Sequence, residues 1–317
     1  MGSQTATQIP VIDLTGENSK PGSSYWVSAY KKIRQALEQH GFFVAEYDKL
    51  PLELHDNILS DVAELFELPY ETKIQNTSDK PAHGYIGKIA AIPLHEGMGI
   101  DRATHLEECE KFTKLMWPSG NDRFCGNAHN YSKLMAELEQ MVVRMVFESY
   151  GVSSYYNAHV ETATYLLRFL SYQKPEIDEA NLAFVTHTDK SFISILHQNH
   201  VLGLELRTAD GNWVGFRPSP TSFVILAGDA CMAWSNDRVK PCYHRVIMKG
   251  KEARYALGFF SFQRNKLIEP PKELVNEDHP LQYKPFDHMG LLQFYDSVDV
   301  RKRAEHTMTK AYCGVST

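Results

Sequence analysis

The hydrophobic pattern of this chain changes about halfway along its length. From about residue 25 to 165, apolar residues recur at spacings of three and four, as they do on one face of an amphipathic helix. From about 163 to 265, short apolar or alternating runs are separated by Gly, Pro and Asn, which is typical of strands joined by turns. We therefore expect a mixed α and β chain in which helices pack on a β-core of the sandwich or barrel type.

The first half contains three predicted helices. The first ends at Gly41, and the second ends before Pro69, because glycine and proline are common just after helices. The third is predicted to begin with an N-cap at Ser132 and to end at Tyr150.

The second half contains the predicted strands. Residues 204–206 and 213–216 flank Asp210-Gly211, a dipeptide that favours a β-hairpin. Residues 223–227 form a fully apolar strand, and residues 254–262 form another. These strands would supply the β-core.

Composition narrows the function. The chain has 317 residues, 43% of them hydrophobic, which is enough for a large core. Its net charge of −6 argues against a dedicated nucleic-acid binder, and its apolar runs are too short to span a membrane. The five scattered cysteines form no CxxC pair, and the N-terminus carries no secretory pattern. We expect a cytoplasmic monomer.

A possible metal site follows from one short motif. In a strand, His187 and Asp189 would lie on the same face, with Thr188 on the other. His244, 57 residues later (244 − 187), would complete two imidazoles and one carboxylate, the ligand set of non-haem Fe(II) oxygenases. This set leaves coordination positions open for a cosubstrate and O₂. The alternative is a surface histidine beside a capping aspartate.

Arg254 begins the last predicted core strand. Counting by two places Ala256 and Gly258 on its face, where their small size leaves room for a ligand. An arginine that points into a β-core is costly unless an anion pairs with it, and a ligand carboxylate is the simplest partner. Phe260 and Phe262 would then wall the adjoining substrate space. The alternative is an arginine exposed at the strand end.

Another strand candidate carries Arg168, Leu170 and Tyr172 on one face. The phenol of Tyr172 could donate to the same ligand carboxylate, or it could be purely structural. Arg168 could meet a polar or acidic group of the substrate, or it could pair with a neighbouring carboxylate.

With these residues in place, the chain resembles the plant 2-oxoglutarate/Fe(II)-dependent dioxygenases, the soluble class of specialised and hormone metabolism. The resemblance covers nearly the whole length and is strongest with the branch of the glucosinolate side-chain dioxygenases and steroidal-alkaloid hydroxylases. The segments that match the family are Ile9-Pro10-Val11-Ile12-Asp13-Leu14, Gln39-His40-Gly41-Phe42-Phe43, Leu65-Phe66-Glu67-Leu68-Pro69, Glu71-Thr72-Lys73, Gly84-Tyr85, His187-Thr188-Asp189, Gly228-Asp229, Trp234-Ser235-Asn236 and Tyr243-His244-Arg245-Val246. The segments that match the branch are Pro21-Gly22-Ser23-Ser24, His187-Thr188-Asp189-Lys190 and Lys284-Pro285-Phe286.

The resemblance implies a double-stranded β-helix core (jelly-roll, cupin-like) with packed N-terminal helices. It divides the chain into a mainly helical region at 1–160, the Fe(II)/2-oxoglutarate-binding core at 161–270, and a helical tail at 271–317 that closes the substrate site.

The resemblance also implies roles for matching residues. His187, Asp189 and His244 would hold Fe(II), while Arg254 and Tyr172 would hold the distal carboxylate of 2-oxoglutarate. O₂ would be the second cosubstrate and ascorbate the reductant, with no catalytic residue beyond the metal ligands. Arg168, Phe260 and Phe262 are the candidate substrate contacts.

Two positions depart from the family pattern. Ala256 stands where relatives have the serine of an Arg-x-Ser motif, so one hydroxyl offered to 2-oxoglutarate is missing. A missing hydrogen bond of this kind costs about 1 kcal/mol. Leu170 stands where many relatives have Asn in an Asn-Tyr-Tyr-Pro run.

The resemblance implies oxidation of an unactivated C–H bond of a small plant specialised metabolite or hormone, with hydroxylation as the main expectation. Desaturation and O- or N-demethylation by the same oxidising chemistry are alternatives. Two other classes stay open: a non-catalytic small-molecule binding protein on the same fold, and a zinc hydrolase that uses the same three ligands.

Overall fold

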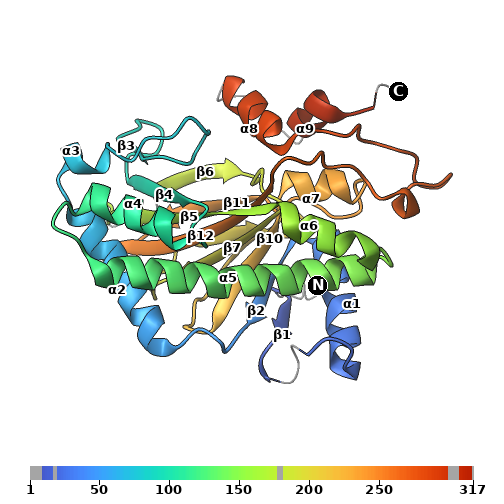
Figure 1. Ribbon diagram of the computed structural model, residues 1–317, viewed down its shortest axis with the longest axis horizontal. Helices are drawn as coiled ribbons and strands as arrows, with labels where there is room; N and C mark the ends of the chain where they lie inside the picture. The colour runs from blue at the N-terminus through green and yellow to red at the C-terminus, as the bar shows by residue number, and fades with distance from the viewer. Residues whose placement is uncertain (1–8, 17–19, 177–180, 299–306, 316–317) are drawn as a thin grey trace, which may run out of the picture.

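Two β-sheets form the centre of the molecule, and helices cover the outside of the larger one (Figure 1). The larger sheet has the strand order β1-β2-β10-β7-β12-β5-β4-β3, and the smaller has the order β6-β11-β8-β9. Most neighbours pair antiparallel, whereas β1 pairs parallel with β2. The structure, a computed structural model, describes residues 9–16, 20–176, 181–298 and 307–315. It confirms a mixed α and β chain with a double-stranded β-helix core and packed N-terminal helices.

The described strands are β1 (Val11–Asp13), β2 (Phe42–Glu46), β3 (Ile86–Gly87), β4 (His95–Asp101), β5 (Ala163–Tyr172), β6 (Asn181–His187), β7 (Ile193–Gln198), β8 (Leu204–Arg207), β9 (Trp213–Gly215), β10 (Ser222–Ala227), β11 (His244–Met248) and β12 (Arg254–Gln263). The described α-helices are α1 (Ser24–Gln39), α2 (Leu52–Glu67), α3 (Tyr70–Lys73), α4 (Leu106–Met116), α5 (Asp122–Ser149), α6 (Tyr156–Thr162), α7 (Asp229–Trp234), α8 (His288–Ser297) and α9 (Thr307–Cys313). The N-terminal region thus contributes four strands to the larger sheet besides its helices. The division at 160 and 270 stays a prediction.

Along strands β5 and β12, side chains alternate between two faces of the sheet, as the sequence predicts. The two strands pair along their whole length, from Arg254 opposite Tyr172 to Gln263 opposite Ala163. Because side chains alternate along a strand, one face packs beneath the helices and the other faces the interior between the sheets. The helix-side residues are Tyr165, Leu167, Phe169, Leu257 and Phe259. The interior residues of the same strands include Leu166, Arg168, Leu170, Tyr172, Arg254, Ala256, Phe260 and Phe262.

Helix α5 runs across the outer face of the larger sheet (Figure 1). It begins ten residues before the predicted N-cap at Ser132, so that prediction is wrong (132 − 122). The actual cap is Asn121, whose side chain accepts from the amide of Phe124 at 3.0 Å. Ser132 is buried inside the helix, and its hydroxyl donates to the carbonyl of Ala128 at 2.7 Å. A serine that bonds the carbonyl four residues back can lie within a helix instead of capping it.

The other predicted elements agree with the structure. Gly41 follows α1 at φ +78°, a conformation that favours glycine, and a Cβ there would lie 2.5 Å from the carbonyl of Lys240. Helix α2 ends two residues before Pro69. Strands β8 and β9 form the predicted hairpin around Asp210-Gly211, with Phe216 just outside β9.

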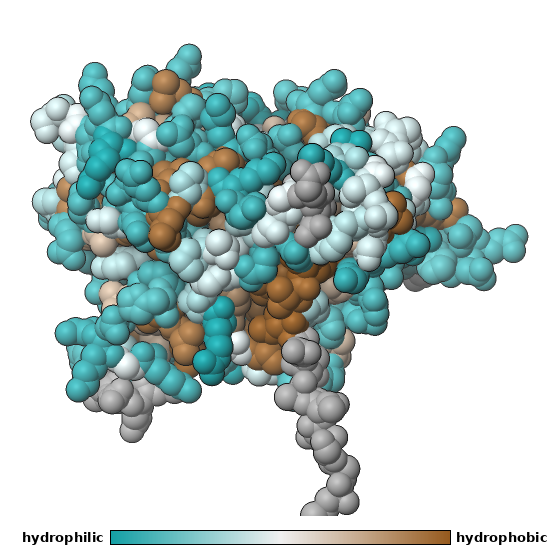
Figure 2. All heavy atoms as spheres, turned by 90° about the horizontal axis from the view of Figure 1, so that it is seen from below, coloured by the Kyte–Doolittle hydropathy of each residue, from teal (hydrophilic) through white to brown (hydrophobic). Residues whose placement is uncertain are grey.

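The exterior is mainly hydrophilic on the face seen from below, where apolar side chains form smaller groups (Figure 2). The five cysteines are all free and buried. In the described ranges, no helix has both the length and the apolar character needed to cross a bilayer.

The end of α5 is fastened to the β-core by a stack of aromatic rings. Phe147 stacks on Trp234 of α7 with ring centroids 4.4 Å apart and an interplanar angle of 16°. We expect Phe147→Ala to lower the free energy of unfolding by about 3–5 kcal/mol, because the substitution leaves a cavity in the core. Chemical denaturation measures this loss.

The matched control is Lys133→Ala, which removes an exposed side chain from the same helix. It should change the free energy of unfolding by less than about 0.5 kcal/mol. Equal losses in the two variants would contradict the proposed anchoring of α5.

Candidate active site

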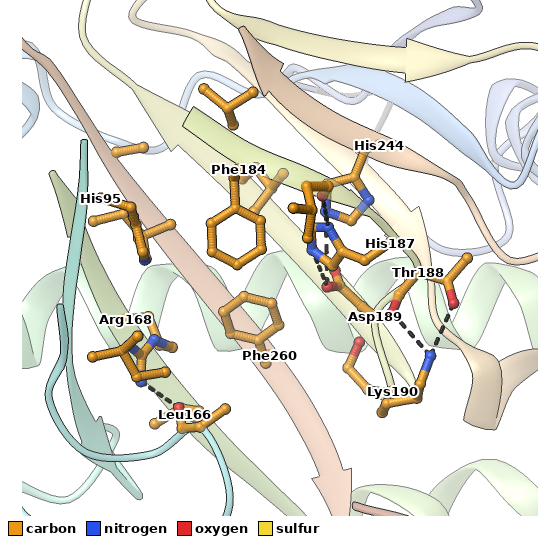
Figure 3. Close-up of a pocket in the computed structure, with 18 of the residues that line it drawn as sticks. His95, Leu166, Arg168, Phe184, His187, Thr188, Asp189, Lys190, His244 and Phe260 are labelled. Atoms are coloured by element: carbon orange, nitrogen blue, oxygen red, sulfur yellow. Dashed lines mark hydrogen bonds and ion pairs between the residues drawn. The ribbon is translucent and has the colours of Figure 1, made fainter. Parts of the chain in front are cut away.

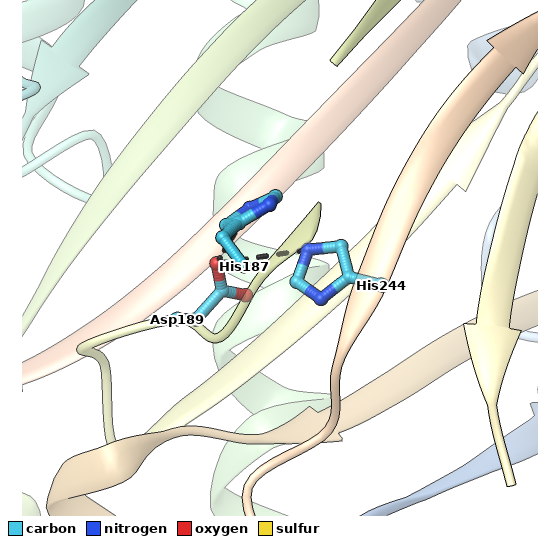
Figure 4. A group of neighbouring side chains, drawn as sticks. All are labelled: His187, Asp189 and His244. Atoms are coloured by element: carbon cyan, nitrogen blue, oxygen red, sulfur yellow. Dashed lines mark ion pairs between the residues drawn. The ribbon is translucent and has the colours of Figure 1, made fainter. Parts of the chain in front are cut away.

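Three side chains converge at one end of the space between the sheets (Figure 4). The nearer oxygen of Asp189, Oδ1, lies 3.6 Å from Nε2 of His187 and 3.8 Å from Nε2 of His244. One candidate ligand atom from each residue lies within 4.8 Å of the other two. These separations leave room for one ion in contact with all three atoms.

The strands explain why residues so far apart in sequence meet. His187 is the last residue of β6 and pairs directly with His244, the first residue of β11. Asp189, however, lies in the loop after β6, so the expectation that His187 and Asp189 share one strand face is wrong. Convergence comes from the turn of the chain after His187.

Backbone carbonyls set the orientation of both imidazoles. Nδ1 of His187 lies 2.8 Å from the carbonyl of Val185, and Nδ1 of His244 lies 3.1 Å from the carbonyl of Cys242. A carbonyl can only accept, so each Nδ1 carries the hydrogen and each Nε2 keeps a lone pair. Metal-binding histidines are commonly fixed in this way.

A hydroxyl holds the carboxylate. Ser194 Oγ on β7 donates to Asp189 Oδ2 at 2.6 Å, which leaves Oδ1 directed at the two Nε2 atoms. Burial, with a smaller contribution from the adjacent His244, lowers the pKa of His187 to about 3. At neutral pH His187 is therefore an uncharged imidazole, the form that binds a metal ion.

These residues line a cavity of about 480 Å³ between the sheets, and all eight site residues predicted from the sequence lie on its wall. They are His187, Asp189, His244, Arg254, Tyr172, Arg168, Phe260 and Phe262. Figure 3 shows the metal-ligand cluster at one side of the cavity and Arg168 at the other, with Phe260 between them. Helix α8 contributes Leu292 and Tyr295 to the wall.

Arg254 is 2% exposed and has no carboxylate partner among the described residues. Its Nη2 donates to Oε1 of Gln198 at 2.6 Å, while its Nε and Nη1 are buried without a hydrogen-bond partner. Its guanidinium carbon lies 4.9 Å from the ring centroid of Tyr172. Burial lowers the pKa of Arg254. The unpartnered Nε and Nη1 atoms are donors that an anion could satisfy.

Three further residues of the site were not predicted from the sequence. Gln198 orients Arg254, and Ser194 orients Asp189. The ring of His95 on β4 lies 4.8 Å from that of Tyr172 at an interplanar angle of 34°. The pKa of His95 is lowered to about 3 by burial and then by the charges of Arg168 and Arg254. Only the pairing of β4 and β7 with the predicted strands could have indicated them.

A β-helix core with a cluster of two histidines and one aspartate is the arrangement that non-haem Fe(II) oxygenases use. The model of the 2OG-Fe(II) oxygenase superfamily matches residues 154–263, and the model of the N-terminal region of non-haem dioxygenases in morphine synthesis matches residues 9–108. The chain belongs to the 2-oxoglutarate/Fe(II)-dependent dioxygenase family and is an enzyme of this class, with Fe(II) and 2-oxoglutarate as cofactor and cosubstrate.

Individual relatives agree. A probable 2-oxoglutarate-dependent dioxygenase, AOP1.2 of Arabidopsis thaliana, is 41% identical over 92% of this chain and 91% of its own length. AOP2 of the same plant, named as probably inactive, is 30% identical over the whole of both chains. The dioxygenase for auxin oxidation 1 of Arabidopsis thaliana, solved with 2-oxoglutarate, superposes with a TM-score of 0.78 at 27% identity, covering 86% of this chain and 100% of that one.

The hydroxyl that orients Asp189 gives a prediction about metal affinity. Ser194→Ala should weaken Mn²⁺ binding by about 10- to 100-fold, because outer-shell partners of metal ligands contribute that much. Isothermal titration with Mn²⁺ measures the affinity directly.

Ser171→Ala is the control, since Ser171 is a buried hydroxyl on β5 that accepts from Gln173 and is not a cavity residue. Its Mn²⁺ affinity should match that of the wild type. If Ser194→Ala also binds Mn²⁺ as tightly as the wild type, Ser194 does not position the carboxylate.

Proposed function

We propose that this dioxygenase hydroxylates an unactivated C–H bond of a small plant specialised metabolite or hormone. His187, Asp189 and His244 hold the iron, and Arg254 with Tyr172 holds the distal carboxylate of 2-oxoglutarate. The observation that carries the proposal is Arg254: a buried guanidinium without a carboxylate partner among the described residues, in the same cavity as the metal-ligand cluster.

The residues present fit the iron. Two Nε2 atoms and one carboxylate oxygen face a common point, and the other polar atom of each side chain is engaged with the protein. When bound, Fe(II) supplies the activation of O₂ and of the keto acid. The protein positions the reactants and excludes bulk water.

The surroundings of Arg254 fit a diacid. Its two free donor atoms, together with the Tyr172 phenol, can satisfy one terminal carboxylate, while the other end of the keto acid reaches the metal cluster. Ala256 is paired with Gln198 across β12 and β7. Ala256 itself offers no hydroxyl. Gln198 instead holds Arg254 by accepting a hydrogen bond from its Nη2.

The substrate is proposed to lie beside this centre, against Arg168, Phe260 and Phe262. Phe260 is half-buried, and Phe262 lies with its ring 5.6 Å from that of His83. Aromatic and aliphatic walls of this kind suit a small organic molecule. Desaturation or demethylation would use the same geometry on a different substrate.

The binding-protein alternative has two supports: the missing hydroxyl at Ala256 and the relative named as probably inactive. The complete set of oriented metal ligands weighs against it. A cytoplasmic monomer without nucleic-acid or membrane partners stays our prediction, and the free, buried cysteines suit a reducing compartment.

Loss of a metal ligand tests the enzymatic proposal. Asp189→Ala should lower Fe(II)- and 2-oxoglutarate-dependent succinate formation in a plant metabolite extract by more than about 100-fold, the upper range for outer-shell partners alone. Asp56→Ala, at an exposed aspartate of α2, is the control and should behave as the wild type. Unchanged turnover in Asp189→Ala, or equal turnover with Zn²⁺, would refute an iron oxygenase at this site.

Two variants with opposite expected effects on 2-oxoglutarate affinity test the proposed role of Arg254. Arg254→Gln should weaken 2-oxoglutarate binding by roughly 30-fold or more, because losing one partner of a buried charge pair costs about 2 kcal/mol or more. Ala256→Ser should strengthen it by about fivefold, the equivalent of one net hydrogen bond of about 1 kcal/mol. Titration of the Mn²⁺-loaded protein measures both.

Arg144→Gln is the matched control, because Arg144 is a half-exposed arginine of α5 that pairs with Glu148. It should leave 2-oxoglutarate affinity unchanged. An Arg254→Gln protein that binds 2-oxoglutarate like this control would place the anchor elsewhere.

A further inference from the structure

The cavity contains a second buried arginine, Arg168, whose charge neither the iron nor 2-oxoglutarate matches. Arg168 is 6% exposed, and its Nη1 donates to the carbonyls of Ala82 and Gly84, the latter at 3.0 Å. Its Nη2 is buried without a hydrogen-bond partner. No carboxylate of the described residues forms an ion pair with it. Burial lowers its pKa only to about 10, so it keeps its charge at neutral pH.

Arg168 and Arg254 are separate sites. Arg254 is opposite Tyr172 and Gly258 is opposite Arg168 in the pairing of β5 and β12. Four residues along a strand correspond to roughly 13 Å between Cα atoms. The two guanidinium groups also have different partners, since Arg168 donates to the carbonyls of Ala82 and Gly84 and Arg254 donates to Gln198. The proposed function assigns the distal carboxylate of 2-oxoglutarate to Arg254, whose guanidinium carbon lies 4.9 Å from the ring centroid of Tyr172.

When the charges of the loaded cavity are counted, the positive charge of Arg168 has no matching negative charge. The two positive charges of Fe(II) and the one of Arg254 balance the carboxylate of Asp189 and the two of 2-oxoglutarate. Lys190, another cation of the described lining, pairs with Asp229 at 2.8 Å. Asp296, a further lining carboxylate, is exposed on α8. A loaded site thus retains one buried positive charge, which is costly unless an anion joins it.

Arg168 has a neutral polar neighbour. A Cβ at Gly97 would lie 2.6 Å from Nη2 of Arg168 and 3.3 Å from Nε2 of His95, so both groups converge on this glycine. His95 is uncharged at neutral pH, since its pKa is about 3. The unpartnered Nη2 of Arg168 can therefore donate to one carboxylate beside an imidazole that adds no second charge.

An aromatic wall joins this end of the cavity to the metal ligands (Figure 3). The ring of Phe184 lies 4.8 Å from the ring of His95 and 4.8 Å from the ring of His187. The two histidine rings are therefore at most twice 4.8 Å apart, about the length of a single aromatic acid. Phe260 adds a further apolar ring to the cavity.

We propose that the substrate is a small organic carboxylate with a flat apolar body. Its carboxylate binds Arg168 beside His95, and its body lies along Phe184 and Phe260 with a C–H bond toward the metal centre. This inference rests on the proposed function, which supplies the iron and 2-oxoglutarate, and it adds the class of substrate. Arg168 is then the residue that selects acids over neutral analogues.

Matched acids and amides test the proposal by binding instead of turnover. The full-length protein is loaded with Mn²⁺ and saturating 2-oxoglutarate, so that Arg254 is occupied, and titrated with phenylacetate, phenylacetamide, naphthalene-1-acetate and naphthalene-1-acetamide. The wild type should bind at least one acid about tenfold or more tightly than its amide, as a buried charge pair requires. Equal affinities, or no binding of either acid, would overturn the proposal.

Variants at Arg168 locate the preference. Arg168→Gln should abolish the preference for the acid while 2-oxoglutarate affinity stays within about twofold of the wild type. Arg168→Lys, which keeps the charge, should retain part of the preference, and Arg144→Gln should retain all of it. A full preference in Arg168→Gln would overturn the assignment. If Arg168→Gln fails to fold, the acid-to-amide ratios of the wild type and Arg168→Lys still decide, and an undiminished ratio in Arg168→Lys counts against a fitted guanidinium.

The two proposals fail in different ways. If the wild-type protein binds neither Mn²⁺ nor 2-oxoglutarate, or only one of them, the proposed iron centre is refuted. Normal binding of both, together with equal affinity for acids and amides, would refute the carboxylate substrate alone.

Discussion

The antiparallel pairing of β5 with β12 is the constraint on which the rest of the site depends. Ten residues of one strand face ten of the other, and each strand alternates between the helix-covered face and the cavity. A shift of one residue in this register would turn Arg254 and Tyr172 into the apolar layer under α5. The apolar residues on the helix side hold the register, and this in turn places the charged residues on the cavity side.

Neutral groups orient the charged residues of the cavity. Backbone carbonyls hold the two imidazoles, a hydroxyl holds Asp189, and an amide oxygen holds Arg254. A carboxylate in place of the Gln198 amide would form an ion pair with Arg254, and the positive charge of the guanidinium would then be matched within the protein. Orientation by dipoles fixes the geometry and leaves the charges available to iron, keto acid and substrate.

The sequence predicts the parts of this site that follow from local pattern. Strand alternation was enough to place Arg168, Tyr172, Arg254, Phe260 and Phe262 on the cavity wall. His95 and Gln198 could not be found in this way, because their positions depend on which strands become neighbours in the sheet. The start of α5 was misplaced for a related reason: Ser132 can cap a helix or bond back within one, and only burial of the preceding turn decides.

The charges of the cavity also imply an order of binding. Without ligands, Arg254 and Arg168 outweigh Asp189 by one charge, and the iron raises this excess by two. At the reduced effective dielectric of a partly enclosed cavity, such an excess favours the doubly charged keto acid most strongly. In the proposed arrangement, that diacid occupies Arg254 and the metal, and one positive charge remains at Arg168. A monoanionic substrate then meets a single matching charge, so the same electrostatics that attracts the cosubstrate first prevents the substrate from taking its place.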